Sequence, residues 1–210
     1  MTHVLSSGQS TRMRLLWRPM LVLLLMASCT VLPEREPVDL FQLPPSAIRA
    51  TDSLQLSGGL RLMIPESSDA LGGSRLLILA ENNNFQAYPG ARWTAPIPQL
   101  WRDWLLDAFW QDGRFAGLST DSAGLQSELS LNGMLRALHT ETIDGRATAV
   151  VRFDALLINS DRREIIASNR FEAREPLTNN NAAASAAALG IAADRLAKEL
   201  IDWAVAHSDP

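Results

Sequence analysis

The chain has 210 residues with 23 acidic and 19 basic side chains, which gives a formal net charge of −4 at pH 7. An acidic chain lacks the basic surface that binds nucleic-acid phosphates, which argues against nucleic acid as a partner. The single cysteine cannot form a disulfide within the chain, so the fold must rest on its hydrophobic core.

The N-terminal segment has the residue order of a secretory signal. Three arginines lie between residues 12 and 18, an apolar run covers residues 21–26, and the small pair Ala27–Ser28 follows. The apolar run is shorter than the ~20 residues that cross a bilayer. Cys29 comes directly after the small pair and resembles the cysteine of a bacterial lipobox, where the chain is cut before the cysteine and the thiol is acylated. The departure is Met26, where Leu is usual, and the alternative is an ordinary signal peptide with an incidental cysteine.

These features predict a signal peptide over residues 1–28, a lipidated Cys29 and a Pro-rich tether over residues 29–38; Met1 and Met13 are both candidate start residues. Removing residues 1–28 takes away three arginines and no acid, which lowers the net charge from −4 to −7. Membrane contact is therefore expected through the acyl chains and not through a basic patch. Thr30 stands where an Asp would retain a lipoprotein in the inner membrane, which favours the outer membrane, facing the periplasm, over the inner membrane.

After the tether, alternation and turn residues indicate short strands. They predict a strand at 39–43, a loop at 46–58, a strand at 60–64, and a hairpin with arms at 75–80 and 85–88. The hairpin turn contains three consecutive asparagines, which tolerate left-handed backbone. Apolar residues from Ile97 to Phe109 recur at spacings of three and four, which predicts an amphipathic helix that Asp112–Gly113 ends.

The second half predicts a meander followed by a long helix. Alternating residues indicate strands at 129–137, 149–157 and 164–171, with a hairpin turn at Asp144–Gly145. An Ala-rich seam from Ala182 to Trp203 predicts a helix begun by Asn179–Asn181. The order strands, helix, strands, helix predicts an α+β fold. We expect a single domain over residues 39–207, with a mainly antiparallel sheet and two long amphipathic helices packed on one face.

The order of several short motifs is similar to that of a known family. After the lipobox come an aromatic-x-Leu-Pro segment, an Arg-Trp pair before the first helix, and Leu-x-Leu-x-Gly and Val-x-Phe-x-Ala-x-Leu on successive strands. Here they are Phe41–Pro44, Arg92–Trp93, Leu129–Gly133 and Val151–Leu157. Over most of residues 29–205 the chain resembles the ABC-type transport auxiliary lipoproteins, which include the paraquat-inducible lipoprotein group. Phe41 departs from the Tyr that members often have.

The resemblance implies a non-enzymatic accessory lipoprotein of an ABC transporter of the mammalian-cell-entry (MCE) type, which moves lipid between the inner and outer membranes. The MCE-domain carrier, the permease and the ATPase would be separate partner chains, and this protein would dock the carrier. The alternative is an outer-membrane assembly or plug lipoprotein, of the lipopolysaccharide-export kind, with no link to an MCE system. Self-association into a ring is a further hypothesis, because a ring would meet a multi-subunit carrier coaxially.

The residue pattern offers no catalytic or cofactor chemistry. The sequence has no glycine-rich phosphate loop ending in Lys-Ser/Thr and no Gly-x-Ser-x-Gly. Two histidines follow Cys29: His139, expected as a solvated residue at the tip of a hairpin, and His207, three residues from the end. Two scattered histidines supply neither a hydrolytic triad nor a zinc ligand set. We therefore expect no enzyme activity, no cofactor and no metal.

Aromatic residues give the one candidate binding patch. Three tryptophans fall on the apolar seams of the two helices and are expected in the core: Trp101, Trp104 and Trp203. Aromatic side chains with arginine are the residues that protein interfaces favour. The candidate partner-docking residues are Phe85, Tyr88, Arg92, Trp93 and Trp110. The alternative is that they plug the end of the sheet.

Overall fold

The computed structural model describes residues 37–50 and 55–208. The predicted signal peptide, Cys29 and the tether up to residue 36 lie outside the described residues. In chain order the elements are β1 (Asp39–Phe41), β2 (Leu56–Leu62), β3 (Glu66–Ser67), β4 (Arg75–Leu79), β5 (Phe85–Trp93), α2 (Ile97–Asp112), β6 (Phe115–Thr120), the short 3₁₀ helix η1 (Asp121–Ala123), β7 (Leu129–Ile143), β8 (Arg146–Asn159), β9 (Glu164–Pro176) and α3 (Ala182–Ala206).

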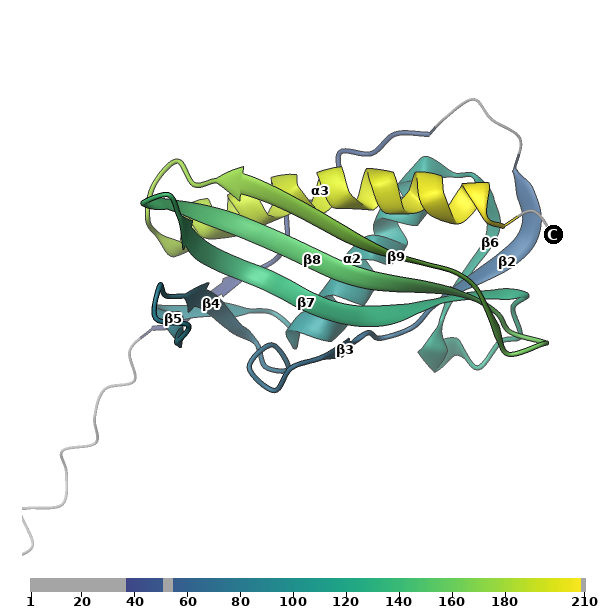
Figure 1. Ribbon diagram of the computed structural model, residues 1–210, viewed down its shortest axis with the longest axis horizontal. Coiled ribbons are helices and arrows are strands. Elements are labelled where there is room, and N and C mark those ends of the chain that lie inside the picture. Colours follow the sequence, from purple (N-terminus) through teal and green to yellow (C-terminus); the bar gives the residue numbers. More distant parts are fainter. Residues whose placement is uncertain (1–36, 51–54, 209–210) are drawn as a thin grey trace, which may run out of the picture. The chain divides into compact units, whose positions relative to one another are not determined.

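The three longest strands form the predicted meander. β8 pairs antiparallel with β7 on one side and with β9 on the other, and the three run side by side (Figure 1). The β7–β8 turn is Asp144–Gly145, and both residues have positive φ (49° and 73°). Two consecutive positive φ angles give the turn that matches the right-handed twist of a hairpin, which is why Asp-Gly is a reliable signal.

The second edge of β7 is occupied by three short strands in succession. β2, β3 and β4 each pair with it in parallel, at Leu129–Leu131, Met134–Leu135 and Thr140–Glu141 respectively. β6 then extends the sheet beyond β2, and β5 and β1 extend it beyond β4. The parallel pairings, β3 and β6 were not predicted from the sequence, because strands of two to seven residues carry little pattern of their own.

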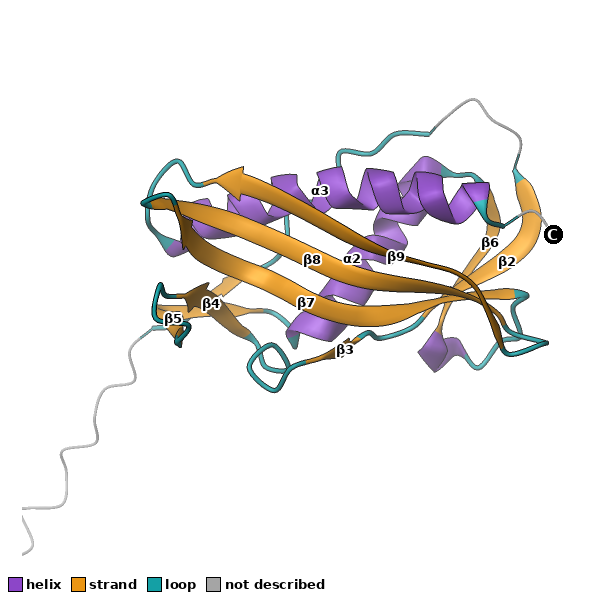
Figure 2. Ribbon diagram, viewed as in Figure 1, coloured by secondary structure: helices purple, strands orange, loops and turns teal. Residues whose placement is uncertain are grey.

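Both helices pack on the same face of the long strands (Figure 2). Trp101 of α2 contacts Phe153 of β8, with ring centroids 6.0 Å apart, and Trp203 of α3 contacts Phe171 of β9 at 5.6 Å. α2 ends at Gly113, whose φ of 77° lets its N–H bond the Phe109 carbonyl. α3 begins where the Asn181 side chain accepts a hydrogen bond from the Ala184 amide. The α+β fold class is confirmed.

A β-bulge in β7 changes which residues face the helices. The register shifts between Leu135 and Ala137, so that Leu135 pairs with Phe153 on the helix side and Ala137 pairs with Arg152 on the opposite side. The sequence alternation put Ala137 on the same face of the strand as Leu135; the bulge turns it to the opposite face, where it is still buried. One extra residue inverts the facing of everything that follows in a strand.

The segment Leu43–Arg49, here called the strap, crosses both helices. Trp104 Nε1 of α2 donates to the Pro44 carbonyl at 2.7 Å. Asp194 of α3 accepts hydrogen bonds from the Ser46 hydroxyl at 2.7 Å and from the Ala47 amide at 3.1 Å. Gly190 of α3 lets the strap approach closely, because a Cβ atom there would lie 2.6 Å from Cδ of Pro44.

Gly190→Ala is therefore expected to destabilise the fold. At an unconstrained helix position this change would stabilise by up to about 1 kcal/mol. Here the added methyl group meets the Pro44 ring, and we expect a loss of about 1–3 kcal/mol in the free energy of unfolding, measured by urea denaturation. Combining it with Pro44→Gly should recover part of that loss. A single variant as stable as wild type would show that the strap does not press on α3.

Candidate docking surface

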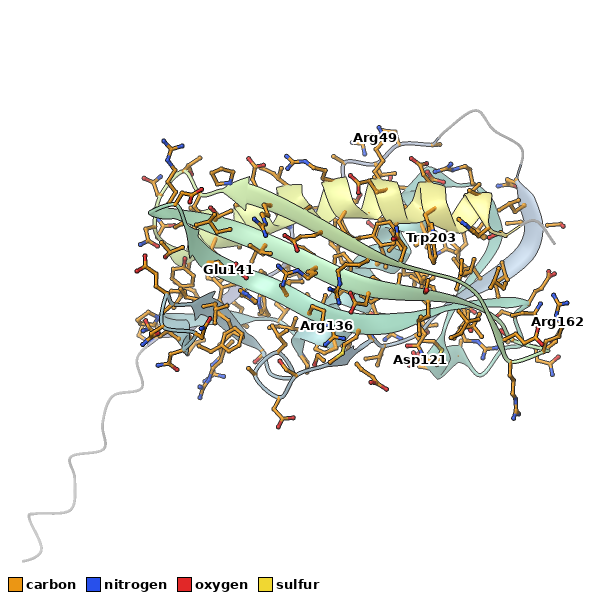
Figure 3. All side chains as sticks on the ribbon, viewed as in Figure 1. Arg49, Asp121, Arg136, Glu141, Arg162 and Trp203 are labelled. Carbon is orange, nitrogen blue, oxygen red and sulfur yellow. The ribbon has the colours of Figure 1, made fainter. Side chains whose placement is uncertain are left out.

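The face of β7, β8 and β9 turned away from the helices, here called the outer face, carries charged side chains. Figure 3 shows Arg136 and Glu141 on the side of the sheet turned to the viewer, in front of the helices. This is the pattern of an antiparallel sheet with one face on the core and the other in water. No helix covers the outer face within the described residues (Figure 2).

Ion pairs link neighbouring strands across the outer face. Asp154 of β8 accepts from Arg136 of β7 at 2.8 Å and from Arg170 of β9 at 2.5 Å. Hydrogen bonds from Arg170, and then from Arg136, lower the pKa of Asp154 to about 2. Glu172 bridges Arg152 and Arg174 in the same way. The outer face therefore holds fixed ionised groups at neutral pH.

His139 lies on the outer face, in the interior of β7, and not at the tip of a hairpin as predicted. β7 continues to Ile143, so His139 stands four residues before the strand end, and its exposed fraction is only 2%. The ring of Phe85 covers it edge-on, with centroids 5.2 Å apart. Its Nε2 lies 2.9 Å from Glu141 Oε1, and Nδ1 has no hydrogen-bond partner among the described residues. Burial lowers the pKa of His139, and the hydrogen bond to Glu141 only partly offsets this.

The buried histidine predicts a loss of stability in mild acid. The folded pKa lies below the unfolded value of about 6.5, so the unfolded chain takes up the proton first as the pH falls. The free energy of unfolding should therefore decrease from about pH 6.5 downward, until the folded pKa is reached. His139→Gln should flatten this dependence in urea titrations between about pH 7.5 and 5.5.

Phe85→Ala tests the cause of this pH dependence. The change uncovers the imidazole, reduces its desolvation and should also flatten the pH dependence, while leaving the titratable group in place. If the free energy of unfolding changes with pH equally in wild type and His139→Gln, His139 is not the cause of the pH dependence.

The structure separates the five predicted docking residues. Phe85 (37% exposed) and Arg92 line one surface hollow of about 660 Å³ at the β4–β5 end of the sheet. Tyr88 and Trp93 are buried in the core, at 8% and 2% exposure, and do not line that hollow. Trp110 is 56% exposed on α2 and does not line that hollow.

A second hollow, of about 460 Å³, lies between the strap and the helices. Within it, Arg114 pairs with Asp112 at 2.7 Å and with Asp202 at 2.6 Å. The hydrogen bond that Arg114 donates to Asp112 raises the pKa of Arg114 above its usual value. No group of three His, Cys, Asp or Glu side chains that could hold a metal ion occurs in the described part of the chain.

Residues 37–50 and 55–208 include no helix with the length and apolar character needed to cross a membrane.

Sequence reasoning missed Arg75 and the outer-face charges. Arg75 stands directly opposite Arg92 in the β4–β5 pair, beyond a register shift that no local pattern reveals. The alternation of Arg170, Glu172 and Arg174 along one strand was the available signal for the outer face.

Two kinds of comparison connect this fold with known proteins. An uncharacterized protein (bll6063) of Bradyrhizobium diazoefficiens is 30% identical over 151 residues, which are 71% of this chain and 40% of that relative. The chain thus spans less than half the length of this relative. Among solved structures, protein XCC0632 from Xanthomonas campestris has a TM-score of 0.73 at 21% identity, covering 80% of this chain and 96% of that chain. The crystal structure of an uncharacterized protein has a TM-score of 0.60 at 18% identity, covering 82% and 100%.

The structural likenesses, at 21% and 18% identity, show a shared fold. The family evidence is more specific, because the sequence model of the ABC-type transport auxiliary lipoprotein component matches residues 41–201. The match begins in β1 and ends in α3, so it includes the strap, α2, the meander and most of α3. The chain belongs to the family of ABC-type transport auxiliary lipoprotein components.

Proposed function

We propose that this protein is a membrane-anchored periplasmic accessory lipoprotein of an ABC/MCE-type transport system. It is anchored through acylated Cys29 in the outer membrane, and it supports lipid transport between the inner and outer membranes by docking the periplasmic MCE-domain carrier. The single observation that carries the proposal is the family match over residues 41–201. The lipobox order of residues 21–29 supports the anchor.

The outer face is the surface that we assign to docking. It carries four arginines (Arg136, Arg152, Arg170 and Arg174) against three carboxylates (Glu141, Asp154 and Glu172). This local excess of positive charge stands on a chain whose overall charge is −4. Arginine and exposed aromatic residues are enriched at protein interfaces, and Phe85 lies at one end of the same face.

A docking role also fits the fixed charges. Asp154 and Glu172 are each held by two arginines, and Glu141 lies within hydrogen-bond distance of His139, so the face presents a preset pattern of donors and acceptors. Preset charge patterns give specificity and faster association more than raw affinity. The proposed role is non-enzymatic, and a family of transport components supports this part of the proposal.

The test is affinity purification of the tagged, full-length protein from detergent-solubilised envelopes, followed by mass spectrometry. Wild type is compared with Arg170→Glu/Arg174→Glu, which reverses two exposed charges on the outer face. The matched control, Arg49→Glu/Lys198→Glu, makes the same charge change at the hollow beside the strap. We expect an MCE-domain protein, the permease and the ATPase to co-purify with wild type and control. The outer-face variant should recover these partner proteins in amounts at least about tenfold lower than wild type does.

Each other result has a definite meaning. Equal recovery with the outer-face variant would move docking to another surface. Recovery of an outer-membrane barrel in place of an MCE-domain protein would favour the assembly or plug alternative. Self-association into a ring is tested separately by analytical ultracentrifugation, where a monomer at high concentration would count against it.

A further inference from the structure

Two arginines face each other on the β4–β5 hairpin. Arg75 and Arg92 are direct cross-strand partners. Side chains in such positions start only ~4.5–5.5 Å apart, and like charges there destabilise the pair. Neither guanidinium forms an ion pair with a carboxylate of residues 37–50 or 55–208, whereas eight other arginines do. Two adjacent cations that have no ion-pair partner attract an anion to the surface between them.

The two arginines share one hollow with an apolar part. The hollow of about 660 Å³ is lined by Arg75, Arg92 and Asp69 together with Leu77, Phe85 and Ala87. Leu77, Phe85 and Ala87 belong to β4 and β5, as the two arginines do. A ligand that fits this hollow has an anionic group for the two guanidinium groups and carbon atoms for the apolar lining.

We propose that the Arg75–Arg92 hollow binds a phosphate-bearing anion. Guanidinium groups bind phosphate oxygens through paired, charge-assisted hydrogen bonds, and two forks can hold one phosphate. One bound phosphate would neutralise both cations and remove their mutual repulsion. Asp69 lines the same hollow and opposes an anion, so it sets an upper limit on the affinity.

The position of the hollow relates it to the lipid anchor. β1 pairs with β5, and Leu40 is the partner of Arg92 in that pairing. Leu40 follows Cys29 by eleven residues. At ~3.3–3.6 Å per extended residue, this segment reaches at most about 40 Å. An anchored chain thus confines Leu40, and the Arg92 beside it, to within about 40 Å of the lipid anchor. A lipid source of the phosphate rests on the anchoring in the proposed function; phosphate binding itself does not.

Calorimetric titration of the mature protein, purified from envelopes in an uncharged detergent, tests the proposal. Three soluble ligands are used: inorganic phosphate, the anionic headgroup glycerophosphoglycerol, and the zwitterionic headgroup glycerophosphocholine. Wild type should bind the two anionic ligands saturably. Arg75→Gln/Arg92→Gln should bind about tenfold more weakly or worse. The matched control Arg146→Gln/Arg162→Gln, which removes two exposed arginines elsewhere, should bind as wild type does. Asp69→Asn should bind more tightly.

The ligands distinguish the two sources of phosphate. Tighter binding of glycerophosphoglycerol identifies a lipid headgroup, and tighter binding of inorganic phosphate identifies a free anion; both results support the site. Absence of saturable binding by wild type, or equal binding by wild type and the double variant, would overturn it. Removing two facing cations relieves repulsion, so the double variant should melt no lower than wild type. If the double variant does not fold, the same titrations are made with the single variants Arg75→Gln and Arg92→Gln. Co-purification of transport partners is independent of all these outcomes.

Discussion

Gly133→Ala is expected to prevent stable folding. Gly133 lies within β7 with a φ of 152°, opposite Ala155 of β8. A Cβ atom at this position would overlap the backbone carbonyl oxygen of Asp154 and would lie 2.8 Å from the Phe153 ring. The carbonyl belongs to a strand paired on both sides, so it cannot move aside without breaking the meander. We expect a loss of more than about 3 kcal/mol in the free energy of unfolding.

Gly145→Ala is the matched control for that change. Gly145 also has a positive φ, of 73°, but a Cβ atom there would meet no atom within 4 Å. Its replacement isolates backbone strain from steric overlap, and should cost about 1–2 kcal/mol. Urea denaturation followed by circular dichroism measures both variants. If Gly133→Ala loses no more stability than Gly145→Ala, overlap with β8 is not the reason for a glycine at this position.

The result bears on the Leu-x-Leu-x-Gly motif. From sequence, the motif in residues 129–133 was one of several weak marks of the family. The structure supplies a physical reason for its last residue, because only glycine leaves room for the neighbouring strand.

Cys29→Ala is expected to abolish attachment of the protein to lipid. Each buried acyl CH₂ contributes about 0.8 kcal/mol to membrane binding, so several acyl chains anchor a protein stably. The variant has no cysteine to acylate and therefore loses this anchor. Metabolic labelling with a radioactive fatty acid should give a labelled wild-type protein and an unlabelled variant. Because the lipobox cut depends on the cysteine, the variant should also accumulate as the uncut precursor, which is larger than the mature wild-type protein.

Met26→Leu is the control for Cys29→Ala. It restores the usual lipobox residue and should leave labelling and cutting unchanged. An ordinary signal peptide with an incidental cysteine predicts a different pattern, in which neither wild type nor Cys29→Ala carries label and both are cut alike. That pattern would remove the anchor from the proposed function.

Local sequence was sufficient for the elements that are long or end in special turns. The helix from Ile97 ends at Gly113, and the last helix begins after Asn181, because capping depends on one residue and its immediate neighbours. The hairpin at Asp144–Gly145 follows from a backbone conformation that few other dipeptides adopt. Each of these features is decided within about four residues.

The structure places the candidate docking residues in different surroundings, and their docking role stays a prediction. Phe85 and Arg92 reach one hollow, whereas Tyr88 and Trp93 point into the core from the same strand. Composition cannot distinguish these pairs, since aromatic residues serve cores and interfaces alike. The face that each residue takes depends on the irregular register between β4 and β5.

The sequence by itself determined the α+β class, both helices, the meander and membership of the lipoprotein family, because these depend on periodicity, caps and motif order along the chain. Only the tertiary structure decided the facing of His139, the pairing of Arg75 with Arg92, and the contact of the strap with Gly190. Each of these joins residues through a bulge, a register or a crossing between distant segments. Such relations arise when elements pack together, and no local pattern records them.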